Sequence, residues 1–295
     1  MPKRFTQSLT GYTGVLGVIG DPIGHSLSPA MHNAALQALA LDYVYVPFSV
    51  SPLHLDEAIA GMRALGIKGL NVTIPHKVAV IDYLDEIEPV AQLIGAVNTI
   101  SNQRGRLVGY NTDGYGFLRS LREEAGCDPR GHRVTIIGAG GAARAIGFQL
   151  ALSKVKTLVV SNRTESRAVA LAAEIREQTG CNVTGTGFDG LKSYVPDTDI
   201  LINTTSLGMY PEIATMPPVE IECLPSSALV CDIVYNPSET LLIQKAQANG
   251  RATLPGLGML AYQGAAALEI WLQVTAPIEA MKAQLRKQLL VIADT

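Results

Sequence analysis

The stretch Val134-Thr135-Ile136-Ile137-Gly138-Ala139-Gly140-Gly141-Ala142-Ala143 runs from a β-branched strand pattern straight into a glycine turn and a helix. In a dinucleotide-binding βαβ unit, Gly138 would permit the tight turn, Gly140 would let the backbone approach a pyrophosphate, and Ala143 is small enough for helix–strand packing. The helix start offers unpaired N–H groups to phosphates. An ordinary tight βα turn is the alternative. The context favours dinucleotide binding, with contacts from Gly138, Ala139, Gly140, Gly141 and Ala142.

The end of the next expected strand, at residues 157–161, indicates which dinucleotide is bound. An NAD enzyme commonly places Asp or Glu there to hold the ribose 2′-hydroxyl. This chain has no acid at that position. Two guanidiniums and a hydroxyl lie within one turn instead, and they suit a 2′-phosphate, although solvated arginines at a helix start are also common. We therefore predict NADP, held by Asn162, Arg163, Thr164 and Arg167.

Short β-branched runs alternate with helical patterns on both sides of this unit, which predicts parallel α/β structure. Before the glycine turn, the pattern predicts strands at residues 15–20, 43–50 and 69–74, helices at 29–41, 53–65 and 114–125, and a hairpin at 97–100 and 107–110. The hairpin would make the first sheet mixed. From the turn onward, it predicts strands at residues 134–137, 157–161, 182–186, 199–203 and 229–234. The expected fold class is α/β with two domains, a mixed, mainly parallel α/β domain and a doubly wound Rossmann domain, joined near Asp113.

Size and composition fit this division. The chain has 295 residues, of which 47% are hydrophobic, so two ordinary domains with substantial cores are expected. The net charge is −3, and without a long basic run nothing indicates nucleic acid or an anionic membrane. Neither a signal peptide nor a membrane span is expected. The four cysteines are widely spaced and apart from the histidines, so we expect reduced cytosolic thiols and no metal site.

Polar residues gather where the strands of the first half give way to helices, and ligands of open α/β sheets bind at such ends. Ser28 followed by Pro29 has the pattern of a helix N-cap. Capping does not explain Ser26 as well, and two hydroxyls at a helix N-terminus could bind a carboxylate. His25, His32 and His76 are assigned to packing or capping.

Lys77 and Asp113 are the candidate acid–base groups. Lys77 lies near an expected helix start, where the helix dipole disfavours a positive charge, so a purely structural lysine is poorly placed there. Asp113 precedes a helix, and on spacing alone an N-cap is the favoured interpretation. It also falls at the expected domain joint, where a cleft would form.

Taken together, these segments resemble the shikimate dehydrogenase family, from about Val15 to the C-terminal helices. The glycine turn and Asn162-Arg163-Thr164 belong to the family pattern. The other motifs are Ser26-Leu27-Ser28-Pro29, Asn71-Val72-Thr73-Ile74-Pro75-His76-Lys77, Gly95-Ala96-Val97-Asn98-Thr99, Asn111-Thr112-Asp113-Gly114, Asn203-Thr204-Thr205-Ser206-Leu207-Gly208-Met209, Asp232-Ile233-Val234-Tyr235-Asn236-Pro237 and Gly256-Leu257-Gly258-Met259-Leu260-Ala261-Tyr262-Gln263. Ala143 replaces the usual third glycine, and Thr204 stands where Ala is usual.

The resemblance implies reversible, NADPH-dependent reduction of 3-dehydroshikimate to shikimate in aromatic amino acid (chorismate) biosynthesis. It implies a catalytic dyad of Lys77 and Asp113. It also implies that Ile233 and Gly256 line the nicotinamide region. The substrate would be held by Ser26, Ser28, Thr73, Lys77, Asn98, Asp113, Tyr235 and Gln263.

The resemblance also implies how the chain is divided and where it works. The C-terminal helices could join either domain on pattern alone, and the family returns them to the first. The expected domains are therefore residues 1–112 plus 256–295 for substrate and 113–255 for NADP. Members are typically cytoplasmic, and many are monomers or dimers.

Two rival functions share parts of this pattern. A quinate/shikimate dehydrogenase using NAD or both cofactors shares every motif, but such relatives often carry Thr at the second serine and an acid at the cofactor strand. Ser28 and the arginine pair argue against it. A non-catalytic NADP-binding regulator could lose Lys77 or Asp113 without penalty, and both are present.

Overall fold

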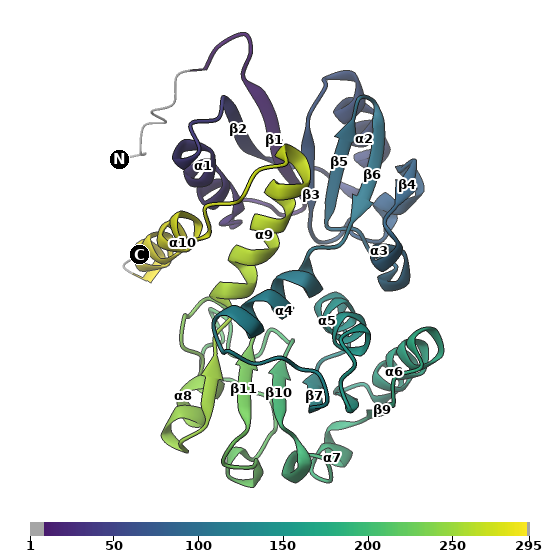
Figure 1. Cartoon of the computed structure of the whole chain (residues 1–295), viewed down its shortest axis with the longest axis vertical. Coiled ribbons are helices and arrows are strands. Elements are labelled where there is room, and N and C mark those ends of the chain that lie inside the picture. The colour runs from purple at the N-terminus through teal and green to yellow at the C-terminus, as the bar shows by residue number, and fades with distance from the viewer. Residues whose placement is uncertain (1–8, 294–295) are drawn as a thin grey trace.

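The computed structural model describes residues 9–293 and contains two six-stranded sheets, one above the other in Figure 1. The first has the strand order β2-β1-β3-β5-β6-β4, and the second has the order β12-β11-β10-β7-β8-β9. This arrangement confirms the fold class predicted from the sequence.

The first sheet is mixed. β1 pairs in parallel with β2 and β3, whereas β5 pairs antiparallel with β3 and β6, as the predicted hairpin requires. β4 pairs in parallel with β6. The strands are β1 (Gly14–Gly20), β2 (Tyr43–Ser49), β3 (Gly69–Val72), β4 (Glu86–Ile87), β5 (Thr99–Gln103) and β6 (Arg106–Tyr110). The helices that follow its strands are α1 (Ser28–Ala38), α2 (Leu55–Ala64), α3 (Pro89–Ile94) and α4 (Asp113–Glu123).

The second sheet is parallel throughout. Its strands are β7 (Arg133–Ile137), β8 (Thr157–Ser161), β9 (Val183–Thr186), β10 (Ile200–Asn203), β11 (Leu229–Asp232) and β12 (Ala252–Leu254). Its helices are α5 (Gly141–Leu152), α6 (Glu165–Thr179), α7 (Phe188–Leu191) and α8 (Leu241–Ala248). The order reverses between β7 and β10, and doubly wound sheets bind ligands at such a switch point. The glycine turn predicted to bind a dinucleotide leaves β7 at this place.

The two C-terminal helices return to the first sheet. They are α9 (Leu257–Leu272) and α10 (Ile278–Ala293), and in Figure 1 α9 extends from the level of α4 up across the first sheet. Leu268 of α9 and Met281 of α10 are buried in one core with Leu16 of β1. On this packing we propose the predicted division into residues 1–112 plus 256–295 and residues 113–255.

The joint between the sheets is close-packed. A Cβ at Gly116 of α4 would lie 2.6 Å from the backbone nitrogen of Gln263 in α9, so only glycine permits this approach. Lys282 of α10 is buried and lies 2.6 Å from Glu124, just after α4. Its amine also donates to the Tyr262 hydroxyl of α9 at 3.0 Å. These contacts fix the helices that carry both sides of the cleft.

Several short elements escaped the sequence patterns, among them β4, β12 and α3. β4 has two residues, β12 has three, and α3 has six, all too short to show a period. Contacts with neighbouring residues stabilise them. β12 pairs with β11. α3 is capped by Glu88, whose carboxylate accepts hydrogen bonds from the backbone N–H groups of Val90 and Ala91.

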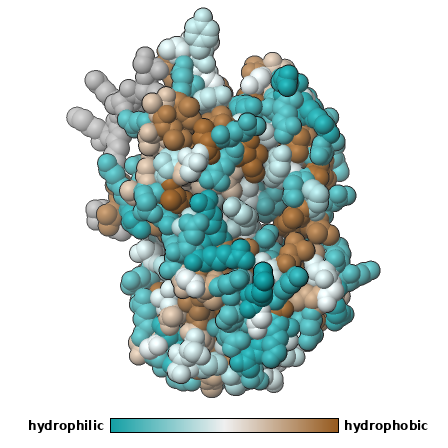
Figure 2. Space-filling view, in the orientation of Figure 1, coloured by the Kyte–Doolittle hydropathy of each residue, from teal (hydrophilic) through white to brown (hydrophobic). Residues whose placement is uncertain are grey.

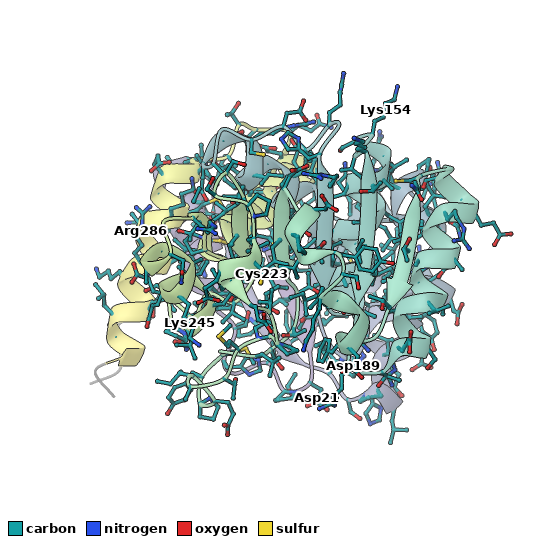
Figure 3. All side chains as sticks on the ribbon, turned by 90° about the horizontal axis from the view of Figure 1, so that it is seen from below. Asp21, Lys154, Asp189, Cys223, Lys245 and Arg286 are labelled. Atoms are coloured by element: carbon teal, nitrogen blue, oxygen red, sulfur yellow. The ribbon has the colours of Figure 1, made fainter. Side chains whose placement is uncertain are left out.

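The carboxyl ends of both sheets face the same side of the molecule. In Figure 3, Asp21 and Asp189 lie toward one edge of the view, and Lys154 lies at the opposite edge. Asp21 follows β1 and Asp189 follows β9, whereas Lys154 precedes β8. The face drawn in Figure 2 is mixed, with apolar patches separated by hydrophilic side chains. Within residues 9–293, no helix combines the length and the apolar character needed to cross a membrane.

Candidate active site

A cavity of about 240 Å³ lies where the carboxyl ends of β3 and β11 approach α9. Its wall mixes apolar groups such as Val18 and Ile23 with many polar ones. The structure brings to this cavity all eight residues predicted to bind substrate, namely Ser26, Ser28, Thr73, Lys77, Asn98, Asp113, Tyr235 and Gln263.

The Lys77 amine donates a hydrogen bond to a carboxylate oxygen of Asp113 at 2.7 Å. The side chains are 29% and 13% exposed respectively, so the pair is shielded yet reaches the cavity. The N-cap interpretation of Asp113 was wrong. α4 begins at Asp113 itself, Thr112 precedes it as the N-cap, and the carboxylate turns toward Lys77.

Asn98 holds the second oxygen of the Asp113 carboxylate. Its Nδ2 donates to Asp113 Oδ1 at 2.8 Å, and its Oδ1 accepts the backbone N–H of Thr112 at 2.8 Å. With one oxygen on Lys77 and the other on Asn98, the carboxylate has a fixed orientation. An amine and a carboxylate in hydrogen-bond contact at a cavity wall can exchange a proton with a bound hydroxyl or carbonyl group.

The two serines lie at the start of α1. Ser28 is the first helical residue, Leu27 precedes it in the helical region, and no side chain caps the helix. The predicted N-cap role of Ser28 was therefore wrong, because the helical conformation begins one residue earlier. The Ser26 hydroxyl accepts the backbone N–H of Ser28 at 3.3 Å. The helix leaves the Ser28 hydroxyl free of any cap bond, at a terminus whose dipole favours an anion.

Tyr235 and Gln263 close the cavity from the other side. Burial raises the pKa of the Tyr235 phenol, so it is a neutral hydrogen-bond donor at neutral pH. Gln263 of α9 donates through Nε2 to the carbonyl oxygen of Leu260 at 2.9 Å, which fixes the amide and leaves Oε1 able to accept a hydrogen bond.

The glycine turn has an open outer side. Gly138 has φ +118°, and a Cβ there would meet the Thr204 hydroxyl at 2.4 Å. A Cβ at Gly140 or Gly141 would meet nothing within 4 Å, so the turn is accessible just before the first N–H groups of α5. Ala139 and Ala142 lie in the same turn and helix start. This geometry suits the close approach of a phosphate.

The residues after β8 form a separate basic group. Arg163 and Arg167 are exposed, and neither has an ion pair with any residue between 9 and 293. Asn162 donates to the carbonyl oxygen of Thr164 at 3.0 Å, which shapes the turn. Two uncompensated guanidiniums beside the end of β8 suit a phosphate.

Ile233 follows β11 and Gly256 follows β12, and both line the substrate cavity. The second sheet therefore contributes to the cavity wall. A Cβ at Gly256 would lie 2.3 Å from the carbonyl oxygen of Ile233, so glycine is required there.

Asp232, the last residue of β11, is buried. Its carboxylate accepts hydrogen bonds from Thr240 at 2.6 Å and from Asn203 at 2.9 Å. Burial raises its pKa to about 6, which the hydrogen bonds oppose.

Sequence reasoning missed several residues at these sites. His25, assigned to packing or capping, is exposed and lines the cavity. Asn71 and Met259 also line it, and both stood within recognised motifs without a role. Thr204 donates to the carbonyl oxygen of Ile137 at 2.8 Å, which joins the loop after β10 to the glycine turn. The switch point between β7 and β10 could have indicated that loop.

Three family models match the chain: "Shikimate dehydrogenase substrate binding domain" over residues 18–100, "Shikimate / quinate 5-dehydrogenase" over residues 121–216, and "Shikimate 5'-dehydrogenase C-terminal domain" over residues 256–286. A shikimate dehydrogenase (NADP(+)) from Desulforamulus reducens is 46% identical over 282 residues, covering 95% of this chain and 97% of the relative.

Solved structures agree. A crystal structure of a shikimate dehydrogenase in complex with NADP+ has a TM-score of 0.90 at 45% identity, covering 96% of this chain and 98% of that one. Shikimate 5-dehydrogenase from Thermus thermophilus, in complex with NADP(H) and shikimate, has a TM-score of 0.83 at 35% identity, covering 93% and 99%. With these likenesses spanning nearly its whole length and both halves of its site, the chain belongs to the shikimate dehydrogenase family.

Proposed function

We propose that this chain is an NADP-dependent shikimate dehydrogenase that reversibly reduces 3-dehydroshikimate to shikimate in aromatic amino acid biosynthesis. The observation that carries this proposal is the Lys77–Asp113 contact of 2.7 Å, at a cavity that Ile233 and Gly256 also line. The similarity to shikimate dehydrogenases (NADP(+)) at 44–49% identity supports the same activity. The enzyme would be cytoplasmic and act as a monomer or homodimer.

The substrate would lie with its carboxylate at the start of α1. Ser26 and Ser28 would donate hydroxyl protons to it, with help from the helix dipole and the neutral Tyr235 phenol. Thr73, Asn98, Asp113 and Gln263 would hold the ring hydroxyls. This places the reacting carbon beside Lys77.

NADP, when bound, supplies the hydride chemistry. Gly138, Ala139, Gly140, Gly141 and Ala142 would hold its pyrophosphate, Asn162, Arg163, Thr164 and Arg167 its 2′-phosphate, and Ile233 with Gly256 its nicotinamide. In the reductive direction negative charge develops on the carbonyl oxygen, and Lys77 would donate a proton to it. In the oxidative direction the neutral amine would accept that proton, while Asp113 orients both the amine and the substrate hydroxyl.

A direct assay tests the proposed function against its quinate-using rival. We expect purified protein to reduce NADP+ when shikimate is added, with kcat/KM at least about tenfold above that for quinate with NADP+ or for shikimate with NAD+. Ser28 and the free arginine pair are the reason for this order. Equal rates with quinate would favour the dual-substrate rival, and no turnover with either acid would refute the proposed activity.

Arg163→Ala tests the cofactor assignment. A charge-assisted hydrogen bond to a phosphate contributes roughly 1.5–3 kcal/mol, so we expect the Kd of NADP+ to rise about 10- to 100-fold. The Kd of NAD+, which has no 2′-phosphate, should stay within about twofold. Arg286→Ala is the matched control, because this exposed arginine lies on α10, at the left of Figure 3. An equal loss of affinity for both cofactors would rule out a 2′-phosphate contact.

A further inference from the structure

Tyr45 of β2 is a core residue with no assigned role. Its side chain is 1% exposed, and its ring stacks on His32 with centroids 4.2 Å apart. A tilted contact with Trp271, at 6.2 Å between centroids, holds the ring from another direction. The phenol donates to Oδ1 of Asn71 at 2.8 Å. Since Asn71 lines the cavity, the Tyr45 hydroxyl contacts the cavity wall through Asn71.

The bond from Tyr45 is the first of a series that ends on the catalytic carboxylate. Asn71 Nδ2 donates to the Thr99 hydroxyl at 3.1 Å. That hydroxyl donates to Oδ1 of Asn98 at 2.9 Å, and Asn98 Nδ2 donates to Asp113 at 2.8 Å. Every donor in this series points the same way, from the core toward Asp113.

The direction of the series is set by its first member. The Thr99 hydroxyl has one proton, which it can give to Asn98 only while Asn71 presents its NH₂ group and not its oxygen. Asn71 presents its NH₂ group there because its oxygen accepts the Tyr45 proton and because the same NH₂ group donates to the carbonyl oxygen of Asn98 at 3.2 Å. Burial raises the pKa of Tyr45 well above its ordinary value, and a side-chain hydrogen bond with Ser28 lowers this pKa only in part. The phenol therefore keeps its proton at any working pH.

Loss of the Tyr45 hydroxyl would release this constraint. The Asn71 oxygen would be a buried acceptor without a donor, a cost of roughly 1–3 kcal/mol that an amide flip can relieve. After the flip Asn71 would lose its bond to the Asn98 carbonyl, and its oxygen would face Thr99 and draw the Thr99 proton away from Asn98. Asn98 Oδ1 would then keep the backbone N–H of Thr112 but lose the Thr99 donor. Both the amide at the cavity wall and the support of Asp113 would then change.

We propose that Tyr45 is a positioning residue of the reaction: its phenol fixes the Asn71 amide and, through Thr99 and Asn98, the orientation of the Asp113 carboxylate. This inference rests on the proposed shikimate dehydrogenase activity. Tyr45 touches no reacting atom and acts only through its hydrogen-bonded neighbours.

The first test compares Tyr45→Phe with Tyr262→Phe. Both remove one hydroxyl from a buried tyrosine, but the Tyr262 hydroxyl accepts from Lys282 and is outside the series. We expect Tyr45→Phe to lower the kcat of shikimate oxidation about five- to twentyfold, with the Kd of NADP+ unchanged. Tyr262→Phe should lower thermal stability and leave kcat within about twofold.

A double-mutant cycle separates positioning from general loosening of the core. If Tyr45 acts through Asn71, then Tyr45→Phe in an Asn71→Ala background should cost less than about twofold more in kcat. Thr99→Val breaks the series nearer Asp113 and should reproduce the kcat loss even if Tyr45→Phe folds poorly. Additive losses in the cycle, or wild-type kcat in folded Tyr45→Phe or Thr99→Val, would overturn the proposal. Wild-type protein without shikimate turnover would instead refute the proposed function.

Discussion

Lys77→Ala should lower the kcat of shikimate oxidation by roughly 10²–10⁴-fold, the range typical of a lost general acid–base group. In the oxidative direction the neutral amine is the group that accepts the hydroxyl proton in the proposed arrangement. The side chain contacts Asp113 at 2.7 Å and lines the cavity. An alanine would leave the shikimate hydroxyl without a base to accept its proton as the hydride leaves the carbon. The measurement is steady-state reduction of NADP+ at saturating shikimate.

Cofactor affinity distinguishes this loss from misfolding. The glycine turn and the residues after β8 are on the other sheet, so the Kd of NADP+ for Lys77→Ala should stay within about twofold of wild type. Lys156→Ala, at an exposed lysine before β8, is the matched control and should keep full turnover. If Lys77→Ala retained near-normal kcat, the acid–base assignment would be wrong.

The fold could be predicted because its signals are local. A strand, a glycine turn and a helix are contiguous at β7 and α5, and the hairpin of β5 and β6 is joined by a two-residue turn. Parallel strands buried on both faces read as short apolar runs, as β10 does with all four residues buried. The missed elements β4 and β12 are edge strands of two and three residues, and they exist only because a neighbouring strand pairs with them.

The site could be predicted as a set of residues but not as a geometry. Lys77 and Asp113 are 36 positions apart, and no spacing rule connects a strand end with a helix start in another part of the chain. Local reasoning instead favoured capping for Ser28 and Asp113, because Ser and Asp before a helix are most often caps. Both turned out to be first helical residues whose side chains face the cavity.

The Tyr45 series shows a further limit of local reasoning. Its members come from β2, β3, the start of β5 with the residue before it, and the first residue of α4. No two neighbours in the series except Thr99 and Asn98 are adjacent in sequence. Tyr45 has the alternating pattern of an ordinary core strand residue. Only the packing of His32 and Trp271 around its ring directs the phenol toward Asn71.

His32 should make the stability of the protein depend on pH. It is fully buried between Tyr45 and Trp271, and neither ring nitrogen has a hydrogen-bond partner among residues 9–293. Burial lowers its pKa from 6.5 to about 3. The unfolded chain therefore binds a proton here at any pH between about 3 and 6.5, whereas the folded chain does not. Stability must fall as pH falls through 6.5, by about 1.4 kcal/mol per unit once the unfolded chain is protonated.

His32→Leu removes this dependence and reveals its size. Between about pH 7.5 and pH 5, the free energy of unfolding of the wild type should fall by about 2 kcal/mol relative to His32→Leu, since His32 contributes in one protein only. Urea unfolding at several pH values measures both curves. His132→Leu, at a half-exposed histidine, should stay parallel to the wild type. If the difference in unfolding free energy between wild type and His32→Leu stayed constant with pH, the imidazole would bind its proton equally in the folded and unfolded chains. That result would contradict the lowered pKa expected from its burial.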